Sequence, residues 1–204
     1  MELSRRIKIT SFNCCGVTNK LPIIKELCDE NDIVLLQETW LMPHNLAVLE
    51  KIHANFSAYS ISAVDCTRAL VGRPYGGLSV LWKNSLSNLV KIVPFDDSRI
   101  LGIDICSNGN ILHILNVYLP YYSYENYDIY LEYVGKISSI IEHREHSETL
   151  VFGDFNADVN GEFYNEWNKV CNDYEMIFAD VSLLPDTSVT HVNNFSLTAT
   201  WLDH

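Results

Sequence analysis

Short apolar runs, many with the alternation typical of β-strands, recur along most of this chain. They predict strands over residues 7–13, 33–36, 58–61, 77–82, 89–93, 100–105, 111–119, 149–153, 189–192 and 198–203. Helical spacing, with apolar residues three or four positions apart, occurs over residues 22–28, 130–141 and 163–171. This order of strands and helices predicts a mixed α/β fold.

Local signals support these boundaries. Pro22 suits the first turn of a helix, where its missing N–H costs no hydrogen bond. Asn108-Gly109 supplies the positive φ angles of a tight hairpin between two of the strands. No repeat, charge block or linker-like stretch divides the chain, so residues 1–204 are predicted to form one domain.

Composition narrows the function classes. A globular chain of 204 residues, 48% of them hydrophobic, can bury roughly 70% of its unfolded surface. Its 14 Lys and Arg against 26 Asp and Glu give a net charge of −12. That sign excludes a basic protein that coats nucleic acid through phosphate neutralisation. An enzyme that acts on a phosphodiester through a bound cation stays possible, because carboxylates that hold a metal add to the acidic count.

The cysteines and the apolar segments indicate in which cellular compartment the protein is expected. The six cysteines include the adjacent pair Cys14 and Cys15 and no Cys-x-x-Cys, so we expect reduced, buried thiols rather than disulfides or a zinc site. No segment approaches 18 consecutive apolar residues, and the basic N-terminus is not followed by an apolar run. We therefore expect a soluble, intracellular protein without a membrane partner.

The candidate catalytic residues lie where predicted strands end. Asp154 and Asn156 follow an apolar strand two residues apart, so in extended geometry both would point to the same side. A carboxylate and an amide placed in this way can orient a water and stabilise a developing negative charge. The alternative is an Asx-turn, a local structure with no catalytic role.

Other strand ends carry similar residues, namely Asn13, Glu38, Tyr118 and Asp203. Each alone is an ordinary polar residue where a strand meets solvent. Together they suit a hard cation, because Mg²⁺ takes one or two carboxylates, several waters and a substrate phosphate oxygen.

Six motifs in order resemble those of the endonuclease/exonuclease/phosphatase superfamily. They are Phe12-Asn13, Gln37-Glu38-Thr39-Trp40, Gly76-Gly77-Leu78, Asn116-Val117-Tyr118-Leu119-Pro120, Gly153-Asp154-Phe155-Asn156-Ala157 and Trp201-Leu202-Asp203-His204. The residues of these motifs are most similar to those of the endonuclease domains of non-LTR (LINE-type) retrotransposons and, more distantly, to those of apurinic/apyrimidinic (AP) endonucleases. The resemblance implies a DNase-I-like four-layer α/β sandwich, with two packed mixed sheets between helices and active-site residues at the strand ends.

The resemblance also implies roles for single residues. Glu38 would bind Mg²⁺, or Mn²⁺ as the alternative ion, with Asn13 and Asp203 nearby. Asp154 would orient or deprotonate the attacking water, and Asn156 and Tyr118 would hydrogen-bond the scissile phosphate. Asp203 would pair with the histidine of a Ser-Asp-His motif. The family presents loops to DNA around Gly76-Gly77, which makes Arg68 and Arg73 candidate phosphate contacts.

The resulting hypothesis is a Mg²⁺-dependent, DNA-nicking endonuclease from a retroelement, with a downstream reverse transcriptase domain as partner and the nucleus as its place of action. The chain ends at His204, so we expect the last strand and the Ser-Asp-His motif of the family to be absent. One alternative is therefore a catalytically silent remnant. A third hypothesis is an AP-type repair endonuclease or a phosphomonoesterase of the same superfamily.

Overall fold

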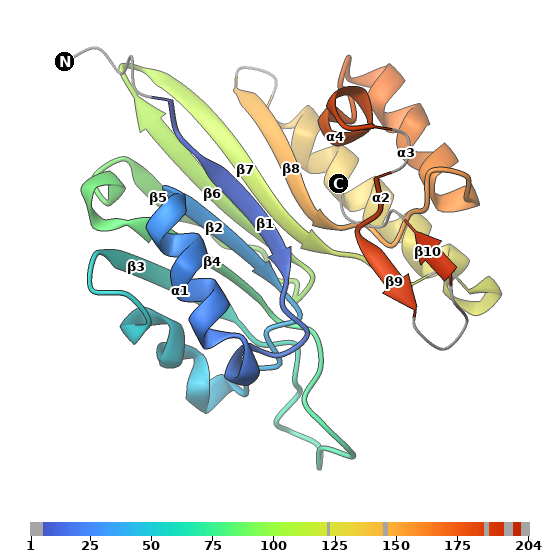
Figure 1. Cartoon of the computed structure of the whole chain (residues 1–204). Coiled ribbons are helices and arrows are strands. Elements are labelled where there is room, and N and C mark those ends of the chain that lie inside the picture. Colours follow the sequence, from blue (N-terminus) through green and yellow to red (C-terminus); the bar gives the residue numbers. More distant parts are fainter. Residues whose placement is uncertain (1–5, 122, 145–146, 186–187, 194–197, 201–204) are drawn as a thin grey trace. The chain divides into compact units, whose positions relative to one another are not determined.

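The computed structural model describes residues 6–121, 123–144, 147–185, 188–193 and 198–200 (Figure 1). By its internal contacts the chain divides into two compact units. The first unit comprises Met1–Tyr118 and Ser147–Gly153, and the second comprises Leu119–His146 and Asp154–His204.

The first unit contains a four-stranded sheet in the order β1-β2-β4-β3. Its strands are β1 (Ile9–Asn13), β2 (Ile33–Gln37), β4 (Leu78–Lys83) and β3 (Phe56–Ile61). β1 and β2 are parallel, whereas β4 is antiparallel to both of its neighbours. The helical elements of this half are α1 (Leu21–Glu30) and the 3-10 segments η1 (Val17–Asn19), η2 (Pro43–Lys51) and η3 (Asn84–Leu86).

β2 is buried on both faces, which explains its unbroken apolar sequence. Val34 and Leu36 belong to the core formed with Ile24 and Cys28 of α1 and with Leu49 of η2. Ile24 and Cys28 are four residues apart and so lie on one face of the helix. Figure 1 shows α1 running across the sheet that contains β1 and β2.

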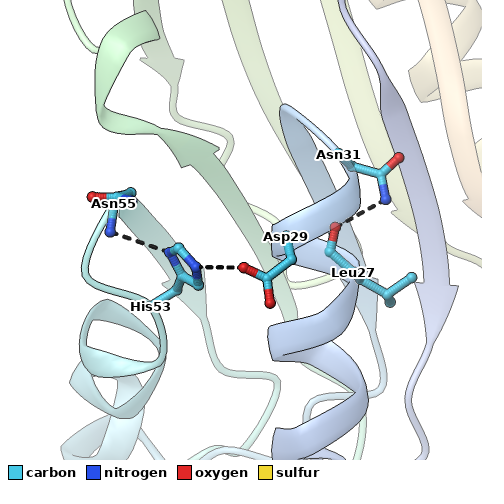
Figure 2. Close-up of polar contacts among 5 residues, drawn as sticks. All are labelled: Leu27, Asp29, Asn31, His53 and Asn55. Atoms are coloured by element: carbon cyan, nitrogen blue, oxygen red, sulfur yellow. Dashed lines mark hydrogen bonds and ion pairs between the residues drawn. The ribbon is translucent and has the colours of Figure 1, made fainter.

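A histidine joins the segment after η2 to α1 (Figure 2). The backbone N–H of Asn55 donates to Nδ1 of His53 at 3.2 Å. Because that N–H can only donate, the ring proton sits on Nε2, which lies 3.0 Å from Oδ1 of Asp29 and donates to it. In the same view the side-chain amide of Asn31 donates to the Leu27 carbonyl at 2.9 Å and closes the end of α1.

The second sheet has the order β5-β6-β7-β8. Its strands are β5 (Val90–Val93), β6 (Ile100–Ser107), β7 (Asn110–Tyr118) and β8 (Glu148–Asp154). The predicted hairpin turn between β6 and β7 is present, with φ of 51° at Asn108 and 83° at Gly109. The two sheets share one core, in which Ile33 and Leu35 of β2 lie in the same cluster as Leu101 and Ile103 of β6.

The second unit is mainly helical. Its elements are η4 (Tyr124–Asn126), α2 (Tyr127–Glu142), α3 (Glu162–Asp173), α4 (Ala179–Leu183) and the paired strands β9 (His191–Asn193) and β10 (Thr198–Thr200). The predicted apolar face of α2 is buried, and the ring of Tyr130 stacks on Phe163 of α3 with centroids 3.4 Å apart. These two helices therefore pack through aromatic rings.

The predicted fold class is confirmed: the chain is α/β, with two sheets packed through a shared core and flanked by helices. Sequence reasoning missed η2 and α4, because neither short segment has a clear apolar period. The last predicted strand is found only as Thr198–Thr200, and residues 201–203 lie outside the described residues. No helix in the described part of the chain is long and apolar enough to cross a membrane.

The expectation of buried cysteines is only partly right. None of the six is in a disulfide, and Cys14 and Cys28 are buried in the core beside α1. Cys15 and Cys66 are exposed, because both lie in connections that leave the first sheet after β1 and β3. An apolar sequence neighbourhood therefore did not predict burial at these two positions.

We expect this difference to appear in thiol labelling. Burial raises the pKa of Cys14 to about 12 and that of Cys28 to about 11, so both stay protonated at neutral pH. Because the thiolate is the reactive form, iodoacetamide should label Cys15 and Cys66 first and reach Cys14 and Cys28 only in denaturant. Peptide mass spectrometry over time measures this order. A C15S/C66S variant should lose the fast phase, and equal labelling rates at all four positions would contradict the assignment.

Candidate active site

Strand topology brings several predicted residues to one edge of the first sheet. β1 and β2 are parallel and in register, with Asn13 opposite Gln37, so both end at the same edge. Asn13 is the last residue of β1, and Glu38 follows β2 directly. β3 ends and β4 begins at this edge too, with Ile61 opposite Leu78. The long β3–β4 connection, which carries both candidate arginines, projects from this edge (Figure 1).

The Glu38 carboxylate is held by two donors. The Asn13 side-chain amide donates to Oε1 at 2.9 Å, and the Trp40 indole N–H donates to Oε2 at 3.1 Å. Oδ1 of Asn13 in turn accepts from the backbone N–H of Cys15 at 3.1 Å. A carboxylate offers about four acceptor positions, so two such bonds orient it without saturating it.

The backbone around Glu38 has an unusual conformation. Glu38 has φ of 51° and Trp40 φ of 53°, the left-handed region that non-glycine residues avoid at a cost of about 1–3 kcal/mol each. Backbone hydrogen bonds hold it on two sides, from Gly16 N to Glu38 O at 2.8 Å and from Trp40 N to Gly76 O at 2.9 Å. The Gly76-Gly77 motif thus contributes backbone carbonyls that support the segment after β2.

The two candidate arginines differ. The Arg73 guanidinium carbon lies 3.7 Å from the centroid of the Trp40 ring, which joins Arg73 to the Glu38 group. The side chain of Arg68 is 87% exposed, and its Nε lies 3.7 Å from a carboxylate oxygen of Asp65. The structure therefore associates Arg73, and not Arg68, with the Glu38 group.

Tyr118 is the last residue of β7, which ends one residue before the predicted strand end at Leu119. Its backbone carbonyl accepts from Nη1 of Arg99 at 3.0 Å, and the guanidinium of Arg99 lies 5.2 Å from the Tyr118 ring centroid. Arg99, the residue before β6, thereby contacts both the backbone and the ring at the end of β7.

A buried polar network underlies this edge. The Asn116 side-chain NH₂ donates to two backbone carbonyls of the first sheet, Leu36 O at 3.1 Å and Ser79 O at 3.0 Å. Because carbonyls only accept, Oδ1 of Asn116 must face the other way, where Nε2 of Gln37 donates to it at 2.5 Å. The same Nε2 lies 3.0 Å from Oγ of Ser11. Asn116 thus links β7 to β2 and β4 and fixes the residues that precede Glu38 and Tyr118.

Replacing Asn116 with Ala is expected to lower the free energy of unfolding by about 3 kcal/mol. The change removes three hydrogen bonds, each worth about 1 kcal/mol, and leaves two carbonyls and the Gln37 amide without this partner. Urea unfolding followed by circular dichroism measures the loss. Asn110→Ala, at the exposed start of the same strand, is the matched control and should change stability by less than about 0.5 kcal/mol. Equal effects of the two changes would refute the role of Asn116.

In the second unit, Asp154 and Asn156 lie in a turn. The backbone N–H of Asn156 donates to Oδ1 of Asp154 at 2.9 Å, which is the Asx-turn considered as the alternative. Asn156 has φ of 50°, so the expectation of two side chains in extended geometry is wrong. Its side-chain amide instead donates to the Leu119 carbonyl at 2.8 Å. Asp154 is 6% exposed, so the turn holds a nearly buried carboxylate.

Two aromatic residues from the helices support this turn. The Tyr130 hydroxyl donates to the Phe155 carbonyl at 2.8 Å, and Nε1 of Trp167 donates to the Tyr130 oxygen at the same distance. Burial raises the pKa of Tyr130, which keeps the hydroxyl protonated as a donor. From the sequence, Tyr130 was assigned only to an apolar helix face, and Trp167 and Trp40 were given no role. The spacing of apolar residues does not indicate which group an aromatic O–H or N–H will bond.

The oxygen donors around Glu38 fit a hard divalent cation. Mg²⁺ needs only one or two carboxylates from the protein, since waters and a substrate phosphate supply the rest. Glu38 provides a carboxylate. Asn13 turns its NH₂ toward that carboxylate, and its amide oxygen, which accepts from the Cys15 N–H, is the atom that would face a cation. Asp203, the other acid predicted near this group, lies outside the described residues. Within the described ranges, no three His, Cys, Asp or Glu residues form a cluster that could hold a metal ion by themselves.

Comparison with known protein families matches residues 10–173 to the endonuclease/exonuclease/phosphatase family. This match spans most of the chain, and the chain belongs to that family. It is therefore a member of a group of hydrolytic nucleases and phosphatases, whose members generally depend on divalent metal ions. A search of curated proteins gave no match.

Several solved structures have the same fold as this chain. The AP endonuclease LMAP from Leishmania major has a TM-score of 0.76 at 13% identity, with 100% of this chain and 79% of that chain covered. The catalytic domain of APE2 from Xenopus laevis has a TM-score of 0.71 at 16% identity, covering 97% and 81%. The 3'-5' exonuclease NExo from Neisseria meningitidis has a TM-score of 0.69 at 16% identity, covering 97% and 85%. At these identities the likeness concerns the fold.

Proposed function

We propose that this protein is a Mg²⁺-dependent phosphodiester hydrolase that nicks DNA, derived from a retroelement. The observation that carries the proposal is the Glu38 carboxylate at the sheet edge, oriented by Asn13 and Trp40, in a chain of the endonuclease/exonuclease/phosphatase family. The retroelement origin rests on the wording of the six sequence motifs. The proposal also includes a reverse transcriptase domain as the partner and the nucleus as the place of action.

In the proposed reaction, Glu38 and Asn13 are the residues that would hold the cation. Bound Mg²⁺ would supply charge stabilisation to the phosphate oxygens. Asp154 orients or deprotonates the water that attacks phosphorus, and Asn156 and Tyr118 hydrogen-bond the scissile phosphate, as the family resemblance implies. The new P–O bond comes from water, and the P–O3′ bond breaks. The products are a 3′-hydroxyl and a 5′-phosphate.

The local structure of Asp154 is compatible with this role. The Asx-turn engages Oδ1, and the Tyr130–Phe155 hydrogen bond holds the backbone that follows. A carboxylate that is fixed before substrate arrives needs little reorganisation during the reaction. The Asx-turn and the catalytic role of Asp154 are thus not exclusive.

Nicking of supercoiled plasmid tests the proposal directly. We expect the purified chain to convert supercoiled to open-circular DNA in the presence of Mg²⁺, and EDTA to stop the conversion. Retention of supercoiled DNA at every Mg²⁺ or Mn²⁺ concentration would contradict the proposal and support the silent alternative. An oligonucleotide with one abasic site and a soluble phosphomonoester should be assayed in parallel. Preferential cleavage of either one would reassign the chain to AP-type repair or to phosphomonoester hydrolysis.

A further inference from the structure

The ring of Trp40 is packed against a glycine. A Cβ atom added to Gly16 would lie 2.5 Å from Cε3 and 2.9 Å from Cζ3 of the indole, and Gly16 has φ of 98°. Only a residue without a side chain allows this contact. The ring is therefore placed directly on the backbone of the segment that follows β1.

The same ring has two further partners. Its N–H donates to Oε2 of Glu38 at 3.1 Å, and the guanidinium of Arg73 stacks over it at 3.7 Å from the centroid. An indole has a single hydrogen-bond donor, so the orientation of the ring also sets the direction of that bond. Trp40 thus contacts both a candidate metal ligand and a candidate phosphate ligand.

Because the Arg73 guanidinium stacks on Trp40 through its face, its N–H groups can still bind an anion. The stack uses the face of the planar group, whereas its N–H donors point outward in the plane. Within the part of the chain that the structure describes, Arg73 forms no ion pair with a carboxylate, in contrast to Arg68 with Asp65. In a chain of net charge −12, such a cation is a favourable contact for a DNA phosphate.

We propose that Trp40 is a positioning residue with two separable effects: its N–H orients the Glu38 carboxylate, and its ring holds Arg73 in place to contact a phosphate of the DNA strand. This inference rests on the proposed function and names two residues that act in it. The indole N–H matters for the cation, and the guanidinium matters for DNA. Removing one should leave the other intact.

Trp40→Leu removes both the ring and the N–H and should show both losses, and two further single variants separate them. Trp40→Phe keeps a ring for Arg73 and removes the N–H, and should weaken Mn²⁺ binding by about 10-fold, as loss of a hydrogen bond to a metal ligand does in other sites. Its affinity for a fluorescein-labelled 20-bp duplex in EDTA should change less than 2-fold. Arg73→Gln should weaken duplex binding by about 3- to 10-fold and reduce the salt dependence by about one phosphate contact. Its Mn²⁺ affinity should change less than 2-fold.

Calorimetry with Mn²⁺ and fluorescence anisotropy with the duplex provide readouts that do not require cleavage. The matched controls are Trp82→Phe, which removes an indole N–H bonded to Ser87, and Lys25→Gln, which removes an exposed charge on α1. Both should leave Mn²⁺ and DNA affinity within 2-fold. An unchanged Mn²⁺ affinity in Trp40→Phe, or a loss of DNA affinity in Arg73→Gln no larger than in Lys25→Gln, would overturn the proposal. A chain that never nicks plasmid but shows both selective losses would refute the proposed function and keep this inference.

Discussion

Replacing Glu38 with Gln is expected to reduce Mg²⁺-dependent nicking by about 10²-fold, which corresponds to about 3 kcal/mol of lost transition-state stabilisation. The change removes the negative charge that, in the proposed function, attracts the cation, and it keeps the shape of the side chain. It also disturbs the local hydrogen bonds, since Asn13 and Trp40 both donate to this group and an amide can accept only through its oxygen. One donor then loses its acceptor, so we expect a stability loss of about 1 kcal/mol.

The measurement is the rate of plasmid nicking under single-turnover conditions, with circular dichroism to verify folding. Glu50→Gln is the matched control, because Glu50 is an exposed carboxylate in η2 outside the sheet edge. It should nick at the wild-type rate. If E38Q nicks within about 3-fold of the wild type at low Mg²⁺, Glu38 does not bind the catalytic cation.

Much of the first unit could be predicted from sequence because its signals are local. The unbroken apolar run of β2 predicted a strand buried on both faces, and Asn108-Gly109 predicted the turn between β6 and β7. That Asn13 lies near Glu38 was implied by the family resemblance, and the parallel pairing of β1 and β2 brings the two residues to one edge. In this unit the strands and the turn that the sequence pattern predicts are those of the structure.

Two parts of the candidate site could not be predicted. The Trp40 contacts depend on left-handed backbone at Glu38 and Trp40, and single non-glycine residues in that region have no sequence signature. Asn116 is an amide in the middle of an apolar strand, and its partners Leu36 and Ser79 lie far away in the chain. Tertiary packing decides both.

The turn of Asp154 shows a different reason for error. Period-two alternation was extended past the end of β8, although the strand stops at Asp154. The Asp and Asn side chains that suggested catalysis are also the residues that favour local turns, and the turn determines the backbone at Asn156. The same Asp and Asn residues thus suit both a catalytic role and a turn, and the residue types alone do not distinguish the two.

Replacing Gly153 with Ala is expected to destabilise the protein by about 3–5 kcal/mol, because strain and overlap add at this position. Gly153 has φ of 141°, and a Cβ there would overlap the carbonyl oxygen of Val117 and lie 2.9 Å from its nitrogen. These are backbone atoms of β7, which cannot rotate away as a flexible side chain would. The close approach of β8 to β7 just before Asp154 therefore requires glycine.

Gly135→Ala in α2 is the control for this change, because a Cβ there meets nothing within 4 Å. In a helix interior that substitution should stabilise by about 0.5–1 kcal/mol, so the two Gly→Ala changes should have opposite signs. Urea unfolding monitored by circular dichroism measures both. Equal stability of G153A and wild type would show that β7 and β8 separate at this point without cost. A folded G153A that still binds Mn²⁺ but no longer nicks would instead attribute the effect to the position of Asp154.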